Sequence, residues 1–135
     1  MTTARYDRQL RIWGAQGQRR LESARICVLN SGPCATETLK NLVLGGIAGF
    51  DLVDDEMVGE EEFGRNYFVK SEGMGKGRAE GACELLKELN GNVGGTVRHE
   101  SVKELIHERR EFFEEFHFVI ATQVMPHALE GANEM

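Results

Sequence analysis

The chain has 135 residues, a mass of 15.1 kDa, a formal net charge of −6 and a pI near 5.3. This length suits one domain built around one hydrophobic core. The acidic balance argues against a nucleic acid or an anionic membrane as the main partner. No apolar run reaches the roughly 20 residues of a membrane span, and the first residues do not form a signal peptide. We therefore expect a cytoplasmic or nuclear protein.

The cysteines and histidines give no sign of a metal site or a disulfide framework. The three cysteines are odd in number and contain no C-x-x-C pair. Cys27 lies in an apolar run, so we expect it in the core. Cys34 lies in a turn and could be a nucleophile, but no histidine is close to it in sequence to activate it. The four histidines lack the spacing of zinc ligands, so no metal site is predicted.

Helices and strands alternate along the chain. Apolar residues at helical spacing predict helices over 7–22, 36–44, 76–89 and 102–116, the first with a break near Gly14 or Gly17. Short runs that are wholly or mainly apolar predict strands over 26–29, 50–53 and 118–121, and a weaker strand is expected over 96–99. This order predicts an α/β fold, namely a Rossmann-like three-layer nucleotide-binding fold with a mainly parallel sheet.

The predicted sheet is small for a fold of this kind. A doubly wound nucleotide-binding sheet commonly has about six strands, whereas the sequence predicts four. We therefore expect a truncated version of the fold, its first half or more. The last predicted strand would then leave an open sheet edge and an uncovered face.

The turn after the first strand is the best candidate for a nucleotide site. The pattern G-x-G-x-x-G/A falls on Asn30, Gly32 and Ala35, and Asn30 can still adopt a left-handed conformation. Pro33 is comfortable in the first turn of a helix, but it has no N–H to donate to a phosphate. The sequence therefore predicts a Rossmann-type turn, and it leaves open whether that turn binds a nucleotide.

Charged residues that could complete such a site follow the second strand. The acids at 54–56 lie where a carboxylate would hold ribose hydroxyls, or they are simply a solvated strand end. Arg65, Lys76 and Arg78 could gather on phosphates if the acidic stretch 57–75 folds back. The alternative for these three is ordinary surface charge.

Several segments resemble the ubiquitin-like-protein-activating enzymes, which have the ThiF/MoeB-type fold. Tyr6–Gly14 (YDRQLRIWG), followed by Gly17-Gln18, is similar to the opening of these enzymes. Leu39–Leu44 resembles their first helix after the nucleotide turn, and Gly75–Glu80 resembles the start of their third helix. Within the family, the regulatory subunit of the neddylation-activating enzyme is the nearest in likeness, as supported by four segments: Ala35–Glu37, Asn41–Leu44, Leu85–Asn90 and Ala121–Gln123.

The resemblance, which runs from Tyr6 to about Met125, implies a function in protein neddylation. Active halves of these enzymes adenylate the C-terminal glycine of a ubiquitin-like modifier with ATP and magnesium, and they work in pairs in which one half has lost its site. Residues 1–135 would then be the N-terminal part of a pseudo-adenylation domain in the regulatory, non-catalytic half. Its partners would be the catalytic subunit, which holds ATP and magnesium, and the modifier.

The nucleotide-binding residues of active halves can be matched position by position. The family's ribose-binding acid corresponds to Glu56, its phosphate-binding arginine to Arg65, and the glutamine that follows to Asn66. Its phosphate-binding lysine corresponds to Arg78, and Gly32 keeps the middle glycine of the turn. Several of these positions carry altered residues, so the resemblance implies a degenerate nucleotide site.

The metal position and two glycines have also changed. The aspartate that holds magnesium in active halves is matched to Val124, which cannot ligate a metal ion. Asn30 and Pro33 replace two glycines of the turn. We therefore expect that this chain binds no cofactor itself.

Arg8 is the residue that the resemblance marks as catalytic. In this family an arginine of the N-terminal helix reaches the ATP phosphates of the partner subunit, and Arg8 matches that position. A guanidinium there would stabilise the charge on the phosphates in trans. The alternative is a surface arginine in a local ion pair.

Three other functions remain open on the sequence alone. One is a self-sufficient ATP-dependent adenylyltransferase of the ThiF/MoeB type, similar to bacterial sulfur-carrier activators. Another is an inactive truncated remnant. A nicotinamide dehydrogenase would need an intact glycine turn and a substrate domain, and the sequence shows neither.

Overall fold

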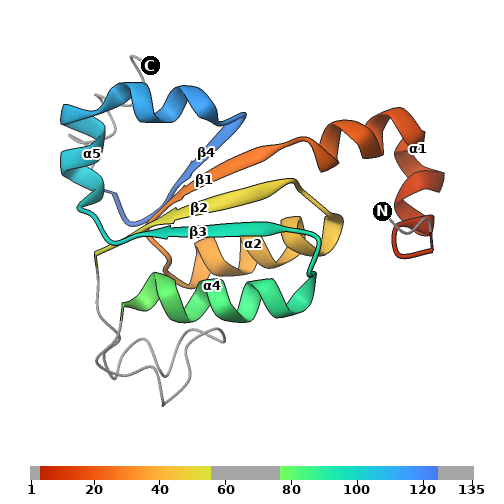
Figure 1. Ribbon diagram of the computed structural model, residues 1–135, viewed down its shortest axis with the longest axis horizontal. Helices are drawn as coiled ribbons and strands as arrows, with labels where there is room; N and C mark the ends of the chain where they lie inside the picture. The colour runs from red at the N-terminus through yellow and green to blue at the C-terminus, as the bar shows by residue number, and fades with distance from the viewer. Residues whose placement is uncertain (1–3, 56–76, 125–135) are drawn as a thin grey trace.

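The computed structural model describes residues 4–55 and 77–124 (Figure 1). The helices are α1 (Asp7–Glu22), α2 (Pro33–Gly45), α4 (Arg78–Leu89), α5 (Val102–Glu108) and the 3-10 helix η2 (Arg110–Glu115). The strands are β1 (Arg25–Leu29), β2 (Gly49–Val53), β3 (Gly94–Arg98) and β4 (Phe118–Ala121). Within these ranges, no helix combines the length and apolar character needed to cross a membrane.

The four strands form one parallel sheet in the order β3-β2-β1-β4. Helices α2 and α4 cover one face of this sheet, and α5 with η2 covers part of the other (Figure 1). The chain therefore has three layers, and each described strand connection leads to a parallel strand. This confirms the predicted α/β, Rossmann-like architecture.

Side chains of β1 supply both layers of the core. Ile26 and Val28 pack with residues of α2 and α4, whereas Cys27 and Leu29 pack with residues of α5 and η2. Because successive side chains of a strand point to opposite faces, a strand covered on both sides is apolar at every position. Cys27 is completely buried, as predicted, and burial, with a further contribution from Asp51, raises the pKa of its thiol to about 12.

The predicted helix over 102–116 was wrong in one respect. It is two pieces, α5 and η2, separated at Arg109, whose backbone leaves the helical region with φ −135° and ψ 60°. The Arg109 guanidinium pairs with Glu100 on the chain before α5. The tighter 3-10 turn lets Phe113 enter the core while Phe112 and Phe116 pack at its border. Burial of these rings therefore takes precedence over continuing the α-helix.

Helix α1 is kinked where the sequence predicted a break. Gly14 has φ 74° and ψ 175°, a conformation outside the helical region that glycine adopts without strain. The kink turns the first half of α1 back toward the end of α2, as Figure 1 shows at the N-terminal end of the chain. It therefore sets where the first residues of α1 lie relative to the sheet.

Strand β4 lies at the outer position of the sheet. Among the described residues it pairs with β1 alone, and Phe118 and Val119 are 66% and 39% exposed. The described part of the chain thus has the open edge and the partly uncovered face that its four strands predicted.

Candidate functional site

The turn between β1 and α2 is held by backbone and side-chain contacts to two other strand ends. Asn30 has φ 69°, the left-handed conformation that the sequence predicted for it. Its N–H donates to the carbonyl of Val53 at 2.8 Å, and its Nδ2 donates to the carbonyl of Thr122 at 2.8 Å. The turn is therefore tied to the carboxyl ends of β2 and β4 at once.

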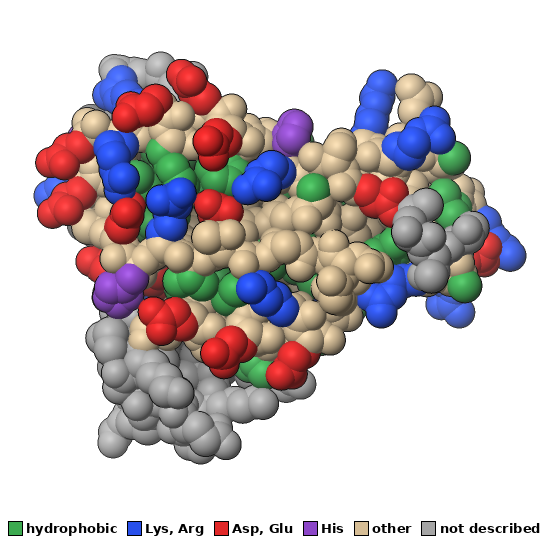
Figure 2. Space-filling view, viewed as in Figure 1, with side chains coloured by type: hydrophobic (Ala, Val, Ile, Leu, Met, Phe, Trp, Pro, Cys, Tyr) green, Lys and Arg blue, Asp and Glu red, His purple; other side chains and the backbone are tan. Residues whose placement is uncertain are grey.

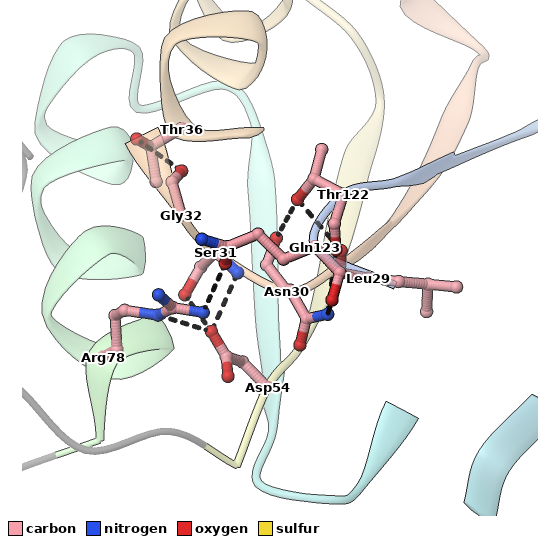
Figure 3. Close-up of polar contacts among 9 residues, drawn as sticks. All are labelled: Leu29, Asn30, Ser31, Gly32, Thr36, Asp54, Arg78, Thr122 and Gln123. Atoms are coloured by element: carbon pink, nitrogen blue, oxygen red, sulfur yellow. Dashed lines mark hydrogen bonds and ion pairs between the residues drawn. The ribbon is translucent and has the colours of Figure 1, made fainter. Parts of the chain in front are cut away.

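Asp54, immediately after β2, is the buried anion of this region. One of its carboxylate oxygens accepts hydrogen bonds from the Ser31 backbone N–H at 2.8 Å and the Ser31 hydroxyl at 2.6 Å. The same oxygen accepts a bond from Arg78 Nε at 2.8 Å (Figure 3). The Ser31 N–H, which could otherwise donate to a ligand at the turn, is thus engaged in an internal hydrogen bond.

Arg78, the first residue of α4, completes an internal ion pair. Its side chain is 3% exposed and that of Asp54 is 0% exposed. A second nitrogen of the guanidinium donates to Oε1 of Gln123 at 3.0 Å. Figure 3 shows these three side chains pointing toward one another beside the turn. The arginine that the resemblance matched to a phosphate ligand is therefore engaged with a carboxylate and a carboxamide of its own chain.

Gln123, two residues beyond β4, lies against Gly32. A β-carbon built on Gly32 would be 2.6 Å from Oε1 and 2.8 Å from Nε2 of Gln123. The absence of a side chain at Gly32 therefore makes room for the carboxamide of Gln123. The backbone of Gln123 is itself left-handed, with φ 56°, which is uncommon for a residue other than glycine.

The residue after β4 that faces the turn is Gln123 and not Val124. The side chain of Val124 packs at the border of the second core cluster, beside Phe112 and Phe116. The match of Val124 to the metal-binding position therefore stays a prediction from the resemblance. Within the described ranges, no three His, Cys, Asp or Glu side chains are arranged to hold a metal ion.

The sequence found part of this cluster and missed the rest. Gly32 and Arg78, two of the predicted site residues, both lie against the side chain of Gln123. The site pattern does not single out Ser31 or Gln123, and it includes Asp54 only as one of three candidate ribose-binding acids. The positions Glu56, Arg65, Asn66 and Lys76 lie outside the described residues. An acid directly after the strand that neighbours a nucleotide-type turn is a signal that could have located Asp54.

Arg8 lies far from this turn. Figure 1 shows α1 at the amino ends of the strands, whereas the turn lies at their carboxyl ends. Arg8 is exposed, and it makes no hydrogen bond or ion pair with another described residue. The carboxylate of Asp7 pairs with Arg11 at 3.1 Å instead. The alternative role for Arg8 was a local ion pair, and no such pair is found within the described part of the chain.

Buried polar contacts fix the helix that carries Arg8. Gln18 is completely buried, and its Oε1 accepts hydrogen bonds from Gln9 Nε2 at 3.0 Å and Trp13 Nε1 at 2.9 Å. Gln9 also donates to the carbonyl of Gly45 at the end of α2, at 2.9 Å. These contacts join the two halves of the kinked helix and fasten both to α2. The glutamines and tryptophan of the opening motif therefore have structural roles.

Tyr6 anchors the start of the same helix. Its ring is buried against Gly46, where a β-carbon would lie 2.6 Å from the ring. Its hydroxyl accepts a hydrogen bond from Asn90 Nδ2 at 2.9 Å, and Asn90 also donates to the carbonyl of Val43. Arg8, two residues further on, is therefore an exposed side chain on a well-anchored backbone.

The surface near α5 and η2 carries both signs of charge. Figure 2 shows acidic and basic side chains interleaved over this end of the molecule. A polar hollow of about 460 Å³ lies there, and its lining includes four acidic residues together with His99 and Arg109. On this face, the charges do not form the basic stripe typical of a nucleic-acid surface.

Comparisons with known proteins agree with the fold and the opening motif. The NEDD8-activating enzyme E1 regulatory subunit of Gallus gallus is 48% identical over 120 residues, covering 89% of this chain and 22% of that protein. The regulatory subunit AXR1 of Arabidopsis thaliana is 45% identical over 121 residues, covering 90% and 22%. The chain thus spans about a fifth of the length of these relatives.

Solved structures show the same fold at low sequence identity. The structure of PaaA has a TM-score of 0.84 at 20% identity, covering 98% of this chain and 43% of that one. The E. coli tRNA N6-threonylcarbamoyladenosine dehydratase TcdA, in complex with ATP, has a TM-score of 0.79 at 20% identity, covering 91% and 50%. The sequence also matches the ThiF family over residues 6–123, so the chain belongs to the ThiF family.

Proposed function

We propose that this chain is the N-terminal part of the regulatory, non-catalytic half of a heterodimeric activating enzyme for a ubiquitin-like modifier, and that it serves protein neddylation. The names and the 45–48% identity of the regulatory-subunit relatives support this proposal. In it, ATP and magnesium bind in the catalytic partner. That partner joins the carboxylate of the modifier's C-terminal glycine to AMP and releases pyrophosphate.

The chain's own turn is a poor fit for nucleotide phosphates. Pro33, at the first position of α2, has no N–H, and the N–H of Ser31 already donates to Asp54. Arg78 is neutralised by the same carboxylate, so its charge is not directed at a ligand. These contacts support a regulatory half that keeps the fold and does not carry out the chemistry.

The observation that carries the proposal is the position of Arg8. It is exposed on α1, at the opposite end of the sheet from the chain's own turn, and it has no polar partner among the described residues. An arginine placed in this way cannot serve the turn of its own chain, but it can reach a neighbouring subunit. There a guanidinium would stabilise the negative charge that develops on ATP as pyrophosphate leaves.

Pyrophosphate exchange by the reconstituted heterodimer tests this role. We expect Arg8→Ala to lower the modifier-dependent exchange rate by at least tenfold, because one charge-stabilising donor is lost, and to leave assembly intact. Arg11→Ala is the matched control, since it removes an exposed arginine of the same helix that pairs with Asp7. Equal exchange rates for the Arg8 variant and the wild type would show that Arg8 has no catalytic role.

A further inference from the structure

We propose that the side chain of Gln123, held by Arg78, blocks the face of the β1–α2 turn at which a nucleotide phosphate would approach Gly32. We call this side chain the plug. The proposal rests on the interpretation of this turn as a former nucleotide site. It adds that the turn is closed by a side chain of the same protein, in addition to lacking a donor at Pro33. Gln123 is then the residue that decides whether an anion can approach Gly32.

The contact with Gly32 is the first support. In dinucleotide-binding turns, the middle glycine lacks a side chain so that the pyrophosphate can approach the backbone. Here the space beside Gly32 is taken by the carboxamide of Gln123, whose three terminal atoms lie 2.6–2.8 Å from the position of a β-carbon. The glycine has been kept, but the group that approaches it is a side chain of the same chain.

The backbone conformation of Gln123 is the second, independent support. Its φ of 56° is rare for a residue with a side chain, so the surrounding structure must hold it. Asn30 Nδ2 donates to the Gln123 carbonyl at 3.3 Å, and the N–H of the preceding Thr122 donates to the Leu29 carbonyl at 3.1 Å. The Thr122 hydroxyl also donates to the Asn30 carbonyl at 3.1 Å. The turn and the Gln123 segment thus fix one another.

Arg78 holds the plug at its other end. Its guanidinium donates to Oε1 of Gln123 at 3.0 Å while it pairs with the buried carboxylate of Asp54. A phosphate at the turn would have to displace the carboxamide and compete with Asp54 for Arg78. Displacing the carboxamide would break its hydrogen bond to Arg78. In addition, the incoming anion would meet an ion pair with no net charge in place of an available positive charge, so both steps oppose anion binding.

Titration of the full chain with inorganic pyrophosphate, followed by calorimetry, tests the plug. Pro33→Gly restores the missing N–H, and the double variant Pro33→Gly with Gln123→Ala also opens the face of Gly32. We expect no binding by the wild type and at least tenfold tighter binding by the double variant than by Pro33→Gly alone. Pro33→Gly with Gln123→Leu is the control, because leucine keeps comparable bulk beside Gly32, and it should bind no better than Pro33→Gly.

Two outcomes of the titration would overturn the plug. One is equal affinity of Pro33→Gly and the double variant with alanine, and the other is no binding by either. Binding of magnesium ATP by the wild type at this turn would overturn both the plug and the degenerate site. The proposed role of Arg8 is measured by exchange in the heterodimer, so its success or failure is recorded separately.

Unfolding of the same chain supplies a test that needs no ligand. Gly32→Ala should lower the melting temperature of the wild type, because the new methyl group displaces Gln123 from Arg78. In a Gln123→Ala background the same substitution should have little effect, since the contact is already gone. Equal losses in both backgrounds would show that Gln123 does not occupy this face.

Discussion

The guanidinium of Arg78 and the carboxylate of Asp54 form an ion pair at 2.8 Å in which both side chains are almost fully withdrawn from water. Truncating one member of such a pair leaves the other as an uncompensated buried charge. We therefore expect Asp54→Ala to lower the free energy of unfolding by about 3–5 kcal/mol, measured by urea denaturation. Asp55→Ala, at the exposed neighbouring position, should change it by less than about 0.5 kcal/mol. A loss below about 1 kcal/mol for Asp54→Ala would contradict a buried charge pair.

Two substitutions of Asn30 separate its backbone conformation from its side-chain hydrogen bonds. Both Asn30→Gly and Asn30→Ala lose the bonds to the carbonyls of Thr122 and Gln123. In addition, the left-handed φ of 69° destabilises the folded alanine variant by about 1–2 kcal/mol, because the β-carbon of alanine is strained in this conformation. In urea denaturation, Asn30→Ala should therefore be less stable than Asn30→Gly by about 1 kcal/mol. An alanine variant as stable as the glycine variant would contradict the left-handed turn.

The buried thiol of Cys27 makes stability depend on alkaline pH. Its pKa is raised from 9.0 to about 12 in the folded chain, mainly by burial, so the unfolded chain releases this proton first. The contribution to stability is complete below about pH 9 and is lost as the pH rises toward 12, by about 1.4 kcal/mol per pH unit. Cys27→Ala should flatten this slope in denaturation curves recorded between about pH 9 and 11. Cys34→Ala, at an exposed position, should keep the wild-type slope.

The only tryptophan of the chain reports on the attachment of α1. Trp13 Nε1 donates to Oε1 of the buried Gln18 at 2.9 Å. Gln18→Leu removes this acceptor, so we expect lower fluorescence anisotropy of Trp13 and a loss of about 1 kcal/mol in the free energy of unfolding. Gln16→Leu makes the same change at an exposed position of α1 and should leave both unchanged. Unchanged anisotropy in the Gln18 variant would show that the hydrogen bond does not hold the indole.

Most of the sheet could be predicted from the sequence because β1, β4 and most of β2 are short runs of apolar residues. The run 26–29 alternates between two covered faces, and 50–53 does the same except at Asp51, which pairs with Arg25 and Arg98. The break of α1 could be predicted for a related reason, since Gly14 permits a conformation that other residues avoid. These features depend on single residues and their neighbours in sequence.

The site and the end of α5 could not be predicted in the same way. Asp54, Arg78 and Gln123 are separated by 24 and 45 residues in sequence, so their contacts exist only after β2, α4 and β4 have been placed. The helical spacing of apolar residues over 102–116 likewise does not predict the break at Arg109. That break depends on how Phe113 meets the sheet, which is a tertiary contact.

The outer strand has a consequence for handling this polypeptide by itself. The side of β4 that pairs with no described strand offers backbone N–H and carbonyl groups next to the exposed ring of Phe118 and the methyl groups of Val119. Such a border is a template on which a second copy can add its own strand. In isolation, the polypeptide should therefore self-associate as its concentration rises, and Val119→Lys should keep it monodisperse in light scattering.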